Sequence, residues 1–222
     1  MDIKKIDSTM SFLELRKTIG ILGVLLPILL LLGNLSCISD IGSMSACYYT
    51  RMGDVFVGSL YAIGFFFLCD KGYDKLDTWA NRIAGLCALL VANFSCEQNT
   101  DGCVTRNLPN LIWSGRADIH YISASILFTT LGLISLFLFT KTNKKEDNPN
   151  YSWEAMTSRK KIRNIIYRVC GIIILSSLVV LVVISKLNLF SKYSPIFICE
   201  TICLFSFGFS WLVKGNTILK DK

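Results

Sequence analysis

Charged residues are scarce in this chain of 222 residues. Only 18% of the residues are charged and 52% are hydrophobic, whereas a soluble domain normally carries about 25% charged residues. The charges collect in short stretches between long apolar runs, which is typical of a polytopic membrane protein. The net charge of +7 comes without a basic face interleaved with aromatic residues. The sequence therefore predicts no nucleic-acid partner.

The motifs of nucleotide and common cofactor chemistry are also missing. The sequence contains no P-loop and no GxGxxG, GxSxG or HExxH pattern, which argues against ATP-driven transport and predicts no cofactor. It has no CxxC pair either, so neither a zinc ribbon nor a thioredoxin-like redox site is expected. The apolar runs lack the period-2 alternation of barrel strands, and helices are therefore expected in a membrane.

Six segments are long and apolar enough to be interpreted as membrane-spanning helices, which need about 17–25 residues. They cover residues 19–38, 53–69, 79–96, 117–140, 165–185 and 194–212. The predicted fold class is all-α: one polytopic integral membrane bundle of six transmembrane helices over residues 1–222.

The distribution of Lys and Arg predicts the direction of these spans. Of the 23 Lys and Arg residues, 18 fall on the side of the two termini and 5 on the other side. Basic residues favour the cytoplasmic side, so both termini are predicted to be cytoplasmic. The Lys- and Ile-rich composition, which also contains many cysteines, is typical of a low-GC bacterium, and the predicted location is the bacterial inner (cytoplasmic) membrane. Residues 141–163 then form a cytoplasmic loop, which either contacts anionic lipid or a partner or only sets the orientation.

Polar residues collect at the opposite, extracytoplasmic side, and they form the candidate ligand-binding set. This set is Asp40, Tyr48, Tyr49, Asp54, His120 and Glu200. Glu200 stands inside an apolar run, and an ionisable residue within a span is a candidate functional residue that faces the bundle interior.

Three interpretations of Glu200 remain open at this point. It acts with His120 as a general acid/base pair, with Asp40 or Asp54 orienting them. It joins these residues around a divalent metal, although no two of them have the i, i+3 or i, i+4 spacing of a specific metal site, and no metal is predicted. Alternatively, it holds the spans together through hydrogen bonds to Tyr, Ser or Arg51.

Nine cysteines fall into two groups. Five lie within spans, where cysteine behaves as a small apolar residue. The other four lie in or beside the outer loops: Cys37, Cys47, Cys96 and Cys103. In an oxidising compartment the simplest pairs are Cys37–Cys47 and Cys96–Cys103. Four free thiols are the equal alternative.

Several short motifs resemble those of a known family. They are CISDIG at residues 37–42, CYYTRMGDVFVGSLYAIGFFF at 47–67, KGYDKLD at 71–77, RIAGLCALLVANF at 82–94, IHYISASILF at 119–128, RNIIYRVCGIII at 163–174 and ETICLFSFGFSWLVKG at 200–215. Together they resemble an uncharacterised bacterial family of six-span membrane proteins classed as a domain of unknown function. More loosely, the chain is similar to the Frag/DRAM group.

The resemblance implies six helices with polar residues at the extracytoplasmic mouth. It places Ser39, Asp40, Asp54, His120 and Glu200 there. The chain departs from the bacterial pattern at residues 41–46, which separate a serine pair from the two tyrosines.

Two functions are consistent with these features. The first is a membrane protein that binds or passes a lipid or small solute at the outer mouth, with membrane lipids as its partners and an unknown oligomeric state. The alternative is an intramembrane hydrolase or transferase acting on lipid headgroups, with Glu200 and His120 as acid and base and Asp54 as a further candidate. The sequence shows no motif for a nucleophile.

Overall fold

The computed structural model describes residues 3–36, 41–72, 74–97, 116–141, 156–187 and 194–219, and these residues are helical with short connections. The long helices are α1 (Ile3–Gly33), α2 (Gly53–Cys69), α3 (Lys75–Asn93), α4 (Ala117–Leu133), α6 (Ser158–Leu187) and α7 (Pro195–Lys214). Two short elements are the 3₁₀-helix η2 (Ser45–Tyr49) and the π-helix η3 (Ile134–Leu138), which continues α4. Each predicted apolar run coincides with one long helix. The all-α fold class is confirmed.

Four of these helices are long and apolar enough to cross a membrane. Their apolar segments are Phe12–Gly33, Ala117–Leu138, Ser158–Leu187 and Pro195–Lys214. Helix α2 is apolar but has only 17 residues. Helix α3 has polar residues in its first half, including Asp77, Asn81 and Arg82. Length and composition therefore support four spans directly.

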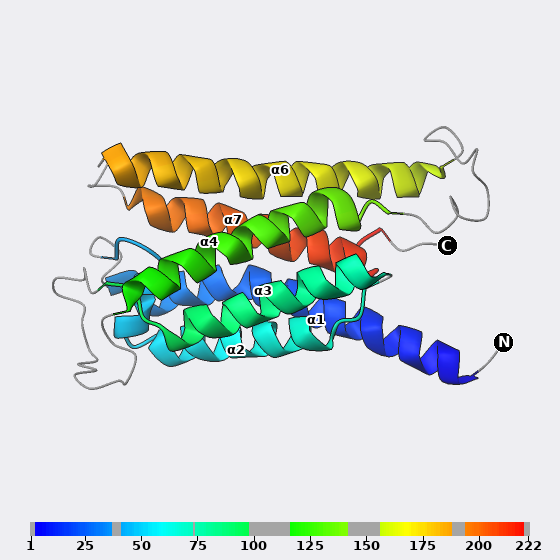
Figure 1. Cartoon of the computed structure of the whole chain (residues 1–222), viewed down its shortest axis with the longest axis horizontal. Coiled ribbons are helices and arrows are strands. Elements are labelled where there is room, and N and C mark those ends of the chain that lie inside the picture. Colours follow the sequence, from blue (N-terminus) through cyan, green and yellow to red (C-terminus); the bar gives the residue numbers. More distant parts are fainter. Residues whose placement is uncertain are drawn as a thin grey trace.

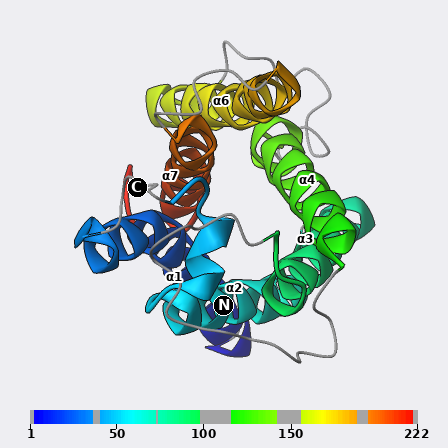
Figure 2. The same ribbon diagram turned by 90° about the vertical axis from the view of Figure 1, so that its left-hand side faces the viewer.

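The six helices form a closed ring (Figure 2). Going round the ring, each helix contacts the next in the order α1, α2, α3, α4, α6, α7, and α7 contacts α1 again. Helix α1 begins and α7 ends at the same end of the bundle, here named the termini end (Figure 1). The opposite end carries η2 and is named the loop end.

Glycine pairs bring neighbouring helices into close contact at three interfaces. The pairs are Gly20 with Gly208 (α1 and α7), Gly64 with Gly85 (α2 and α3) and Gly132 with Gly171 (α4 and α6). A Cβ atom on Gly208 would lie 2.8 Å from the Gly20 carbonyl oxygen and 2.8 Å from the backbone nitrogen of Val24. Small residues at such contacts are typical of helix packing in membranes.

The interior of the ring is filled differently at its two ends. Aromatic side chains occupy the half toward the termini end: Phe67, Phe139, Tyr167, Phe207 and Trp211, none more than 5% exposed. The Trp211 ring lies 5.0 Å from that of Phe67 and 5.1 Å from that of Phe139, in edge-to-face geometry. A second cluster, which includes η2 and Leu26, fills the loop end.

Large aliphatic side chains cover the outer surface of the ring. On α6, Ile172 is 57% exposed and Val179 is 63% exposed. An apolar outer surface of this extent is what a lipid environment accommodates, whereas a soluble protein rarely exposes large contiguous apolar patches. The surface therefore agrees with the membrane character of the helices.

Candidate functional site

The segment that follows α1 folds across the loop end of the ring (Figure 2). Its turn is held by backbone hydrogen bonds, from the Ala46 N–H to the Ser43 carbonyl at 3.2 Å and from the Cys47 N–H to the Met44 carbonyl at 3.0 Å. The Thr50 hydroxyl donates to the Cys47 carbonyl at 2.9 Å and helps to end η2. Met44 and Ser45 of this segment are buried, and both face the interior of the ring.

Glu200 lies in the second turn of α7 and contacts this segment. The Met44 backbone N–H donates to Oε2 of Glu200, with 2.5 Å between nitrogen and oxygen. The Ser45 side chain also interacts with the Glu200 side chain. A charge-assisted hydrogen bond from a backbone N–H is stronger than a neutral one. The acid is thus compensated by a loop that is 156 positions away in the sequence.

His120 lies in the first turn of α4 and is only 1% exposed. Its Nδ1 lies 2.7 Å from the Phe94 carbonyl oxygen, and its Nε2 lies 3.0 Å from Oγ of Ser45. A carbonyl oxygen can only accept, so Nδ1 carries the hydrogen. In the neutral imidazole Nε2 is then the acceptor. The Ser45 hydroxyl therefore donates to His120.

Ser45 connects the two ionisable side chains that the sequence predicted to lie near each other. Its Oγ contacts Nε2 of His120, and its side chain also interacts with Glu200. The predicted meeting of Glu200 and His120 is thus indirect, through a serine. The hydroxyl has a single hydrogen, which either Nε2 of His120 or the Glu200 carboxylate can accept, so the two groups compete for the same donor.

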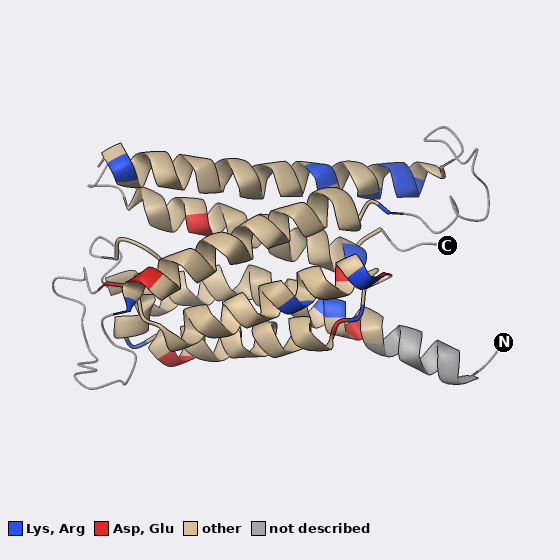
Figure 3. Cartoon of the chain, in the orientation of Figure 1, with Lys and Arg blue, Asp and Glu red and all other residues tan. Residues whose placement is uncertain are grey.

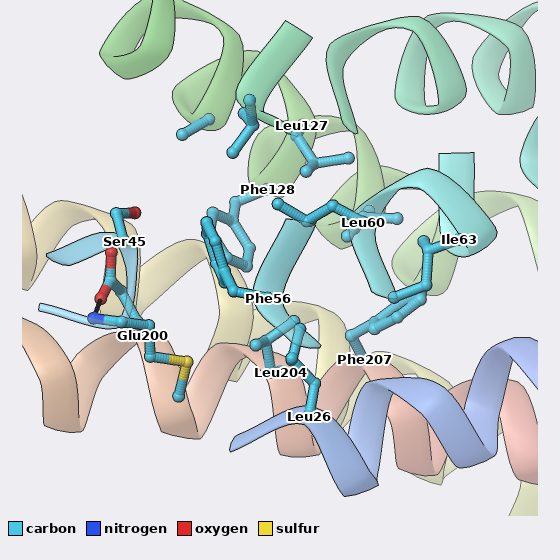
Figure 4. Close-up of a pocket in the computed structure, with 14 residues that line it drawn as sticks. Leu26, Ser45, Phe56, Leu60, Ile63, Leu127, Phe128, Glu200, Leu204 and Phe207 are labelled. Atoms are coloured by element: carbon cyan, nitrogen blue, oxygen red, sulfur yellow. Dashed lines mark hydrogen bonds between the residues drawn. The ribbon is translucent and has the colours of Figure 1, made fainter. Parts of the chain in front are cut away.

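A cavity of about 50 Å³ lies inside the ring and is lined by both Ser45 and Glu200. Its polar lining residues are Ser45 and Glu200, at one end (Figure 4). The rest of the lining is aliphatic or aromatic and comes from α1, α2, α3, α4 and α7: Leu26, Phe56, Leu60, Ile63, Val91, Ala124, Leu127, Phe128, Leu131, Leu204 and Phe207, with Met44 from the loop. A mostly apolar cavity with a few convergent polar groups is a candidate ligand site.

The other predicted ligand residues lie outside the cavity lining. Tyr48 and Tyr49 are buried and pack edge to face, with their ring centroids 5.5 Å apart. The Tyr49 hydroxyl donates to the Cys96 carbonyl at 2.6 Å, which ties η2 to the end of α3. Asp54 is exposed in the first turn of α2, and Asp40 lies outside the described residues.

The predicted disulfides are not seen in the described part of the chain. Cys37 and Cys103 lie outside it. Cys47 and Cys96 are free, and they are buried at 0% and 4% exposure. Burial, with a smaller contribution from the nearby Glu200 charge, raises the pKa of each thiol to about 12. Within the same residues, no group of three or more His, Cys, Asp or Glu is arranged to hold a metal ion.

A second polar cluster lies at the termini end. Arg16 forms an ion pair with Asp70 at 3.2 Å, and Asn81 donates to the same carboxylate at 3.0 Å. Burial raises the pKa of Asp70, against the lowering effect of the Arg16 guanidinium. Nearby, Nζ of Lys141 lies 2.6 Å from the carboxylate of Asp77. These contacts join α1, the residue after α2, α3 and the residues that follow η3.

Basic residues dominate this end of the bundle. Figure 3 shows Lys and Arg gathered where α6 begins and α7 ends. Lys214 is 6% exposed, and its Nζ donates to the Phe139 carbonyl at 3.3 Å and lies 5.1 Å from the Phe139 ring centroid. The ammonium over an aromatic face is a cation–π contact. The cluster fastens the helices together at the end where their positive charges lie.

Comparison of the chain with protein-family models, curated proteins and solved structures finds no match. The fold by itself defines the class: an all-helical protein with four helices suited to cross a membrane. The family resemblance drawn from the sequence motifs stays a prediction.

Sequence reasoning missed Ser45 and the Phe94 carbonyl. Ser45 lies in the segment 41–46 that interrupts the family pattern, between the motifs at 37–42 and 47–67, and eight residues before the predicted helix that starts at residue 53. Its position two residues before Cys47, in a loop that continues into two tyrosines, was the available signal, because an outer loop of small and aromatic residues can fold back over the helix ends. The backbone carbonyl gives no sequence signal.

Proposed function

We propose that the chain crosses a bacterial inner membrane six times, with both termini in the cytoplasm. The six helices run in alternating directions through the ring (Figure 1). Lys and Arg gather at the termini end (Figure 3), and basic residues favour the cytoplasmic side. In this topology η2, Ser45 and Glu200 lie at the extracytoplasmic side.

We further propose that the protein binds the apolar chain of a lipid or a similar amphiphile in the ring, with its polar end at Glu200 and Ser45. The carrying observation is the cavity itself, which is apolar along the ring and polar at one end. A cavity of about 50 Å³ is far smaller than the roughly 300–1,000 Å³ of a drug-sized site. It is also smaller than the roughly 150 Å³ of a cavity that binds benzene, so an alkyl chain enters only if the helices of the ring and the side chains of the lining move apart.

The aromatic cluster favours binding over passage. Trp211, Phe67 and Phe207 pack together toward the termini end with exposures of 1% or less. A solute crossing the ring would have to displace these rings. A ligand that enters from the loop end or from the bilayer and stops above them would not.

Native mass spectrometry of gently extracted protein tests this function. We expect a co-purifying lipid in the wild type. Leu127→Trp, which narrows the cavity from α4, should reduce the lipid-bound fraction by tenfold or more. The matched control is Leu133→Trp, because Leu133 lies on the same helix, 43% exposed and outside the cavity lining. Equal lipid occupancy in the wild type and both variants would refute binding in the ring.

A further inference from the structure

We propose that Ser45 is a nucleophile for acyl transfer, activated by His120, and that its substrate class is a carboxylic ester of a long-chain lipid. The inference rests on the proposed function, because the acyl chain would occupy the cavity in the ring. It supplies the nucleophile for which the sequence shows no motif: a serine hydroxyl with a histidine base beside it.

The hydrogen-bond geometry matches the requirement for an activated serine. Oγ of Ser45 lies 3.0 Å from Nε2 of His120, within the range for nucleophile and general base. The Phe94 carbonyl, 2.7 Å from Nδ1, fixes the tautomer and the ring orientation. It takes the place of the third group that orients the base in serine hydrolases. Nε2 is therefore directed at the hydroxyl as an acceptor.

The position of Ser45 also fits an acyl substrate. Ser45 is 9% exposed and lines the polar end of the cavity, and the remaining lining below it is apolar. An acyl chain that parts the apolar lining, which includes Leu60, Leu127 and Leu204, would have its ester group at the polar end, beside Ser45 and Glu200 (Figure 4). Holding a reacting group in place in this way supplies a large part of enzymatic rate enhancement.

The step balances with water as the only co-reactant. Oγ of Ser45 attacks the ester carbonyl carbon while its proton passes to Nε2 of His120. The bond from that carbon to the alcohol oxygen breaks, and His120 gives the proton to the leaving alcohol. Water then attacks the acyl-serine ester, with His120 again taking and returning one proton. The products are an alcohol and a fatty acid, and Ser45 is restored.

A long-chain alkyl fluorophosphonate tests this inference on the full-length protein in detergent. The probe forms an Oγ–P bond and releases fluoride, so intact mass and peptide mapping locate the adduct. We expect labelling on Ser45, loss of the adduct in Ser45→Ala, and full labelling in the control Ser125→Ala, because Ser125 is exposed on α4 and its hydroxyl donates to a carbonyl of the same helix. Folded His120→Gln should react more slowly by about 10²–10⁴-fold, which is the usual contribution of a general base.

The outcomes separate this inference from the proposed function. Absence of an adduct on Ser45 in wild-type protein that still co-purifies with lipid would overturn the nucleophile and leave the lipid site standing. An unchanged labelling rate in folded His120→Gln would also overturn it. If His120→Gln does not fold, the site of labelling in the wild type and in Ser125→Ala decides the question: an adduct elsewhere than on Ser45 would overturn the inference. Loss of lipid binding would refute the proposed function.

Discussion

Replacing Glu200 tests whether its hydrogen bond holds the loop end of the ring together. Glu200→Leu removes the acceptor of the Met44 N–H, whose oxygen lies 2.5 Å from the backbone nitrogen. Met44 is 2% exposed, so water cannot readily replace the lost partner. Glu200→Gln keeps an acceptor for Met44 and adds an amide that can donate to the Ser45 oxygen. The two variants therefore separate the hydrogen bond from the charge.

The size of the effect follows from the burial of the donor. A buried donor left without a partner costs about 1–3 kcal/mol. For a chain of 150–250 residues, 1 kcal/mol shifts the thermal midpoint by about 2–4 °C. Glu200→Leu should therefore lower the midpoint by roughly 2–12 °C. Glu200→Gln should shift it by less than about 3 °C, because only the charge-assisted part of the bond is lost.

The assay is thermal unfolding of purified protein in one detergent at fixed lipid content. The matched control is Glu14→Leu, because Glu14 is exposed on α1 and its carboxylate forms a surface ion pair of 3.7 Å with Lys17. Exposed pairs of this kind contribute little. A midpoint for Glu200→Leu equal to that of the wild type would refute the reasoning. An equal fall in Glu200→Gln would show that the charge, not the hydrogen bond, matters.

Three further predictions concern packing, thiol reactivity and the cluster at the termini end. Gly208→Ala should destabilise the bundle by about 1–3 kcal/mol, because the new methyl group meets backbone atoms at 2.8 Å. In the control Gly58→Ala, the new Cβ has nothing within 4 Å, and the variant should be more stable than the wild type by up to about 1 kcal/mol in unfolding measurements. A lower free energy of unfolding in both variants would contradict the role of the close helix contact at Gly208. At pH 8 a thiol with a pKa of about 12 is ionised to about one part in 10⁴. Iodoacetamide should therefore leave the buried Cys47 unmodified in folded protein and modify the exposed Cys69. Equal modification of the two cysteines by mass spectrometry would refute this prediction. Asp70→Asn should lower stability by about 3–5 kcal/mol, because it removes the carboxylate facing a buried guanidinium, and an unchanged midpoint would show that this ion pair does not hold the helices.

The helices could be predicted from the sequence because their signal is local. A window of about 20 residues is enough to recognise a long apolar run as a helix. The predicted span 53–69 has the same bounds as α2, Gly53–Cys69. The ends of other helices differ from the predicted spans. Helix α6 begins at Ser158 rather than near residue 165, because a polar, basic first turn continues a helix without belonging to its apolar run.

The candidate site could be predicted only in part, because its contacts are distant in the sequence. The rarity of charge within apolar runs was enough to single out Glu200 and His120. Their connection through Ser45 depends on how residues 41–50 fold back over the ring, and no periodicity encodes that. The sequence also could not predict that Asp54 is exposed. The start of α2 lies at the loop end, as expected, but the rotation of α2 about its axis places this side chain outside the cavity lining.

The ion pair of Arg16 with Asp70 shows the same limit at the termini end. The two residues are 54 positions apart, and α1 and α2 are neighbours in the ring. The count of Lys and Arg predicted that Arg16 and the connection after residue 69, where Asp70 lies, are on the same side of the membrane, but it could not pair the two residues. The number of Lys and Arg residues in each connection predicts the topology, whereas the ion-pair partner of each residue depends on the rotation of its helix.

The structural and functional interpretations of Glu200 do not exclude each other. The Met44 N–H that compensates its carboxylate belongs to the same loop that carries Ser45. Removing the acid therefore displaces the hydroxyl as well, and loss of activity in Glu200→Leu would not by itself identify an acid or base. Glu200→Gln keeps the loop in place but cannot transfer a proton. If Glu200→Gln stays folded, binds lipid and still reacts with the fluorophosphonate at Ser45, then Glu200 positions the loop and His120 alone transfers the proton.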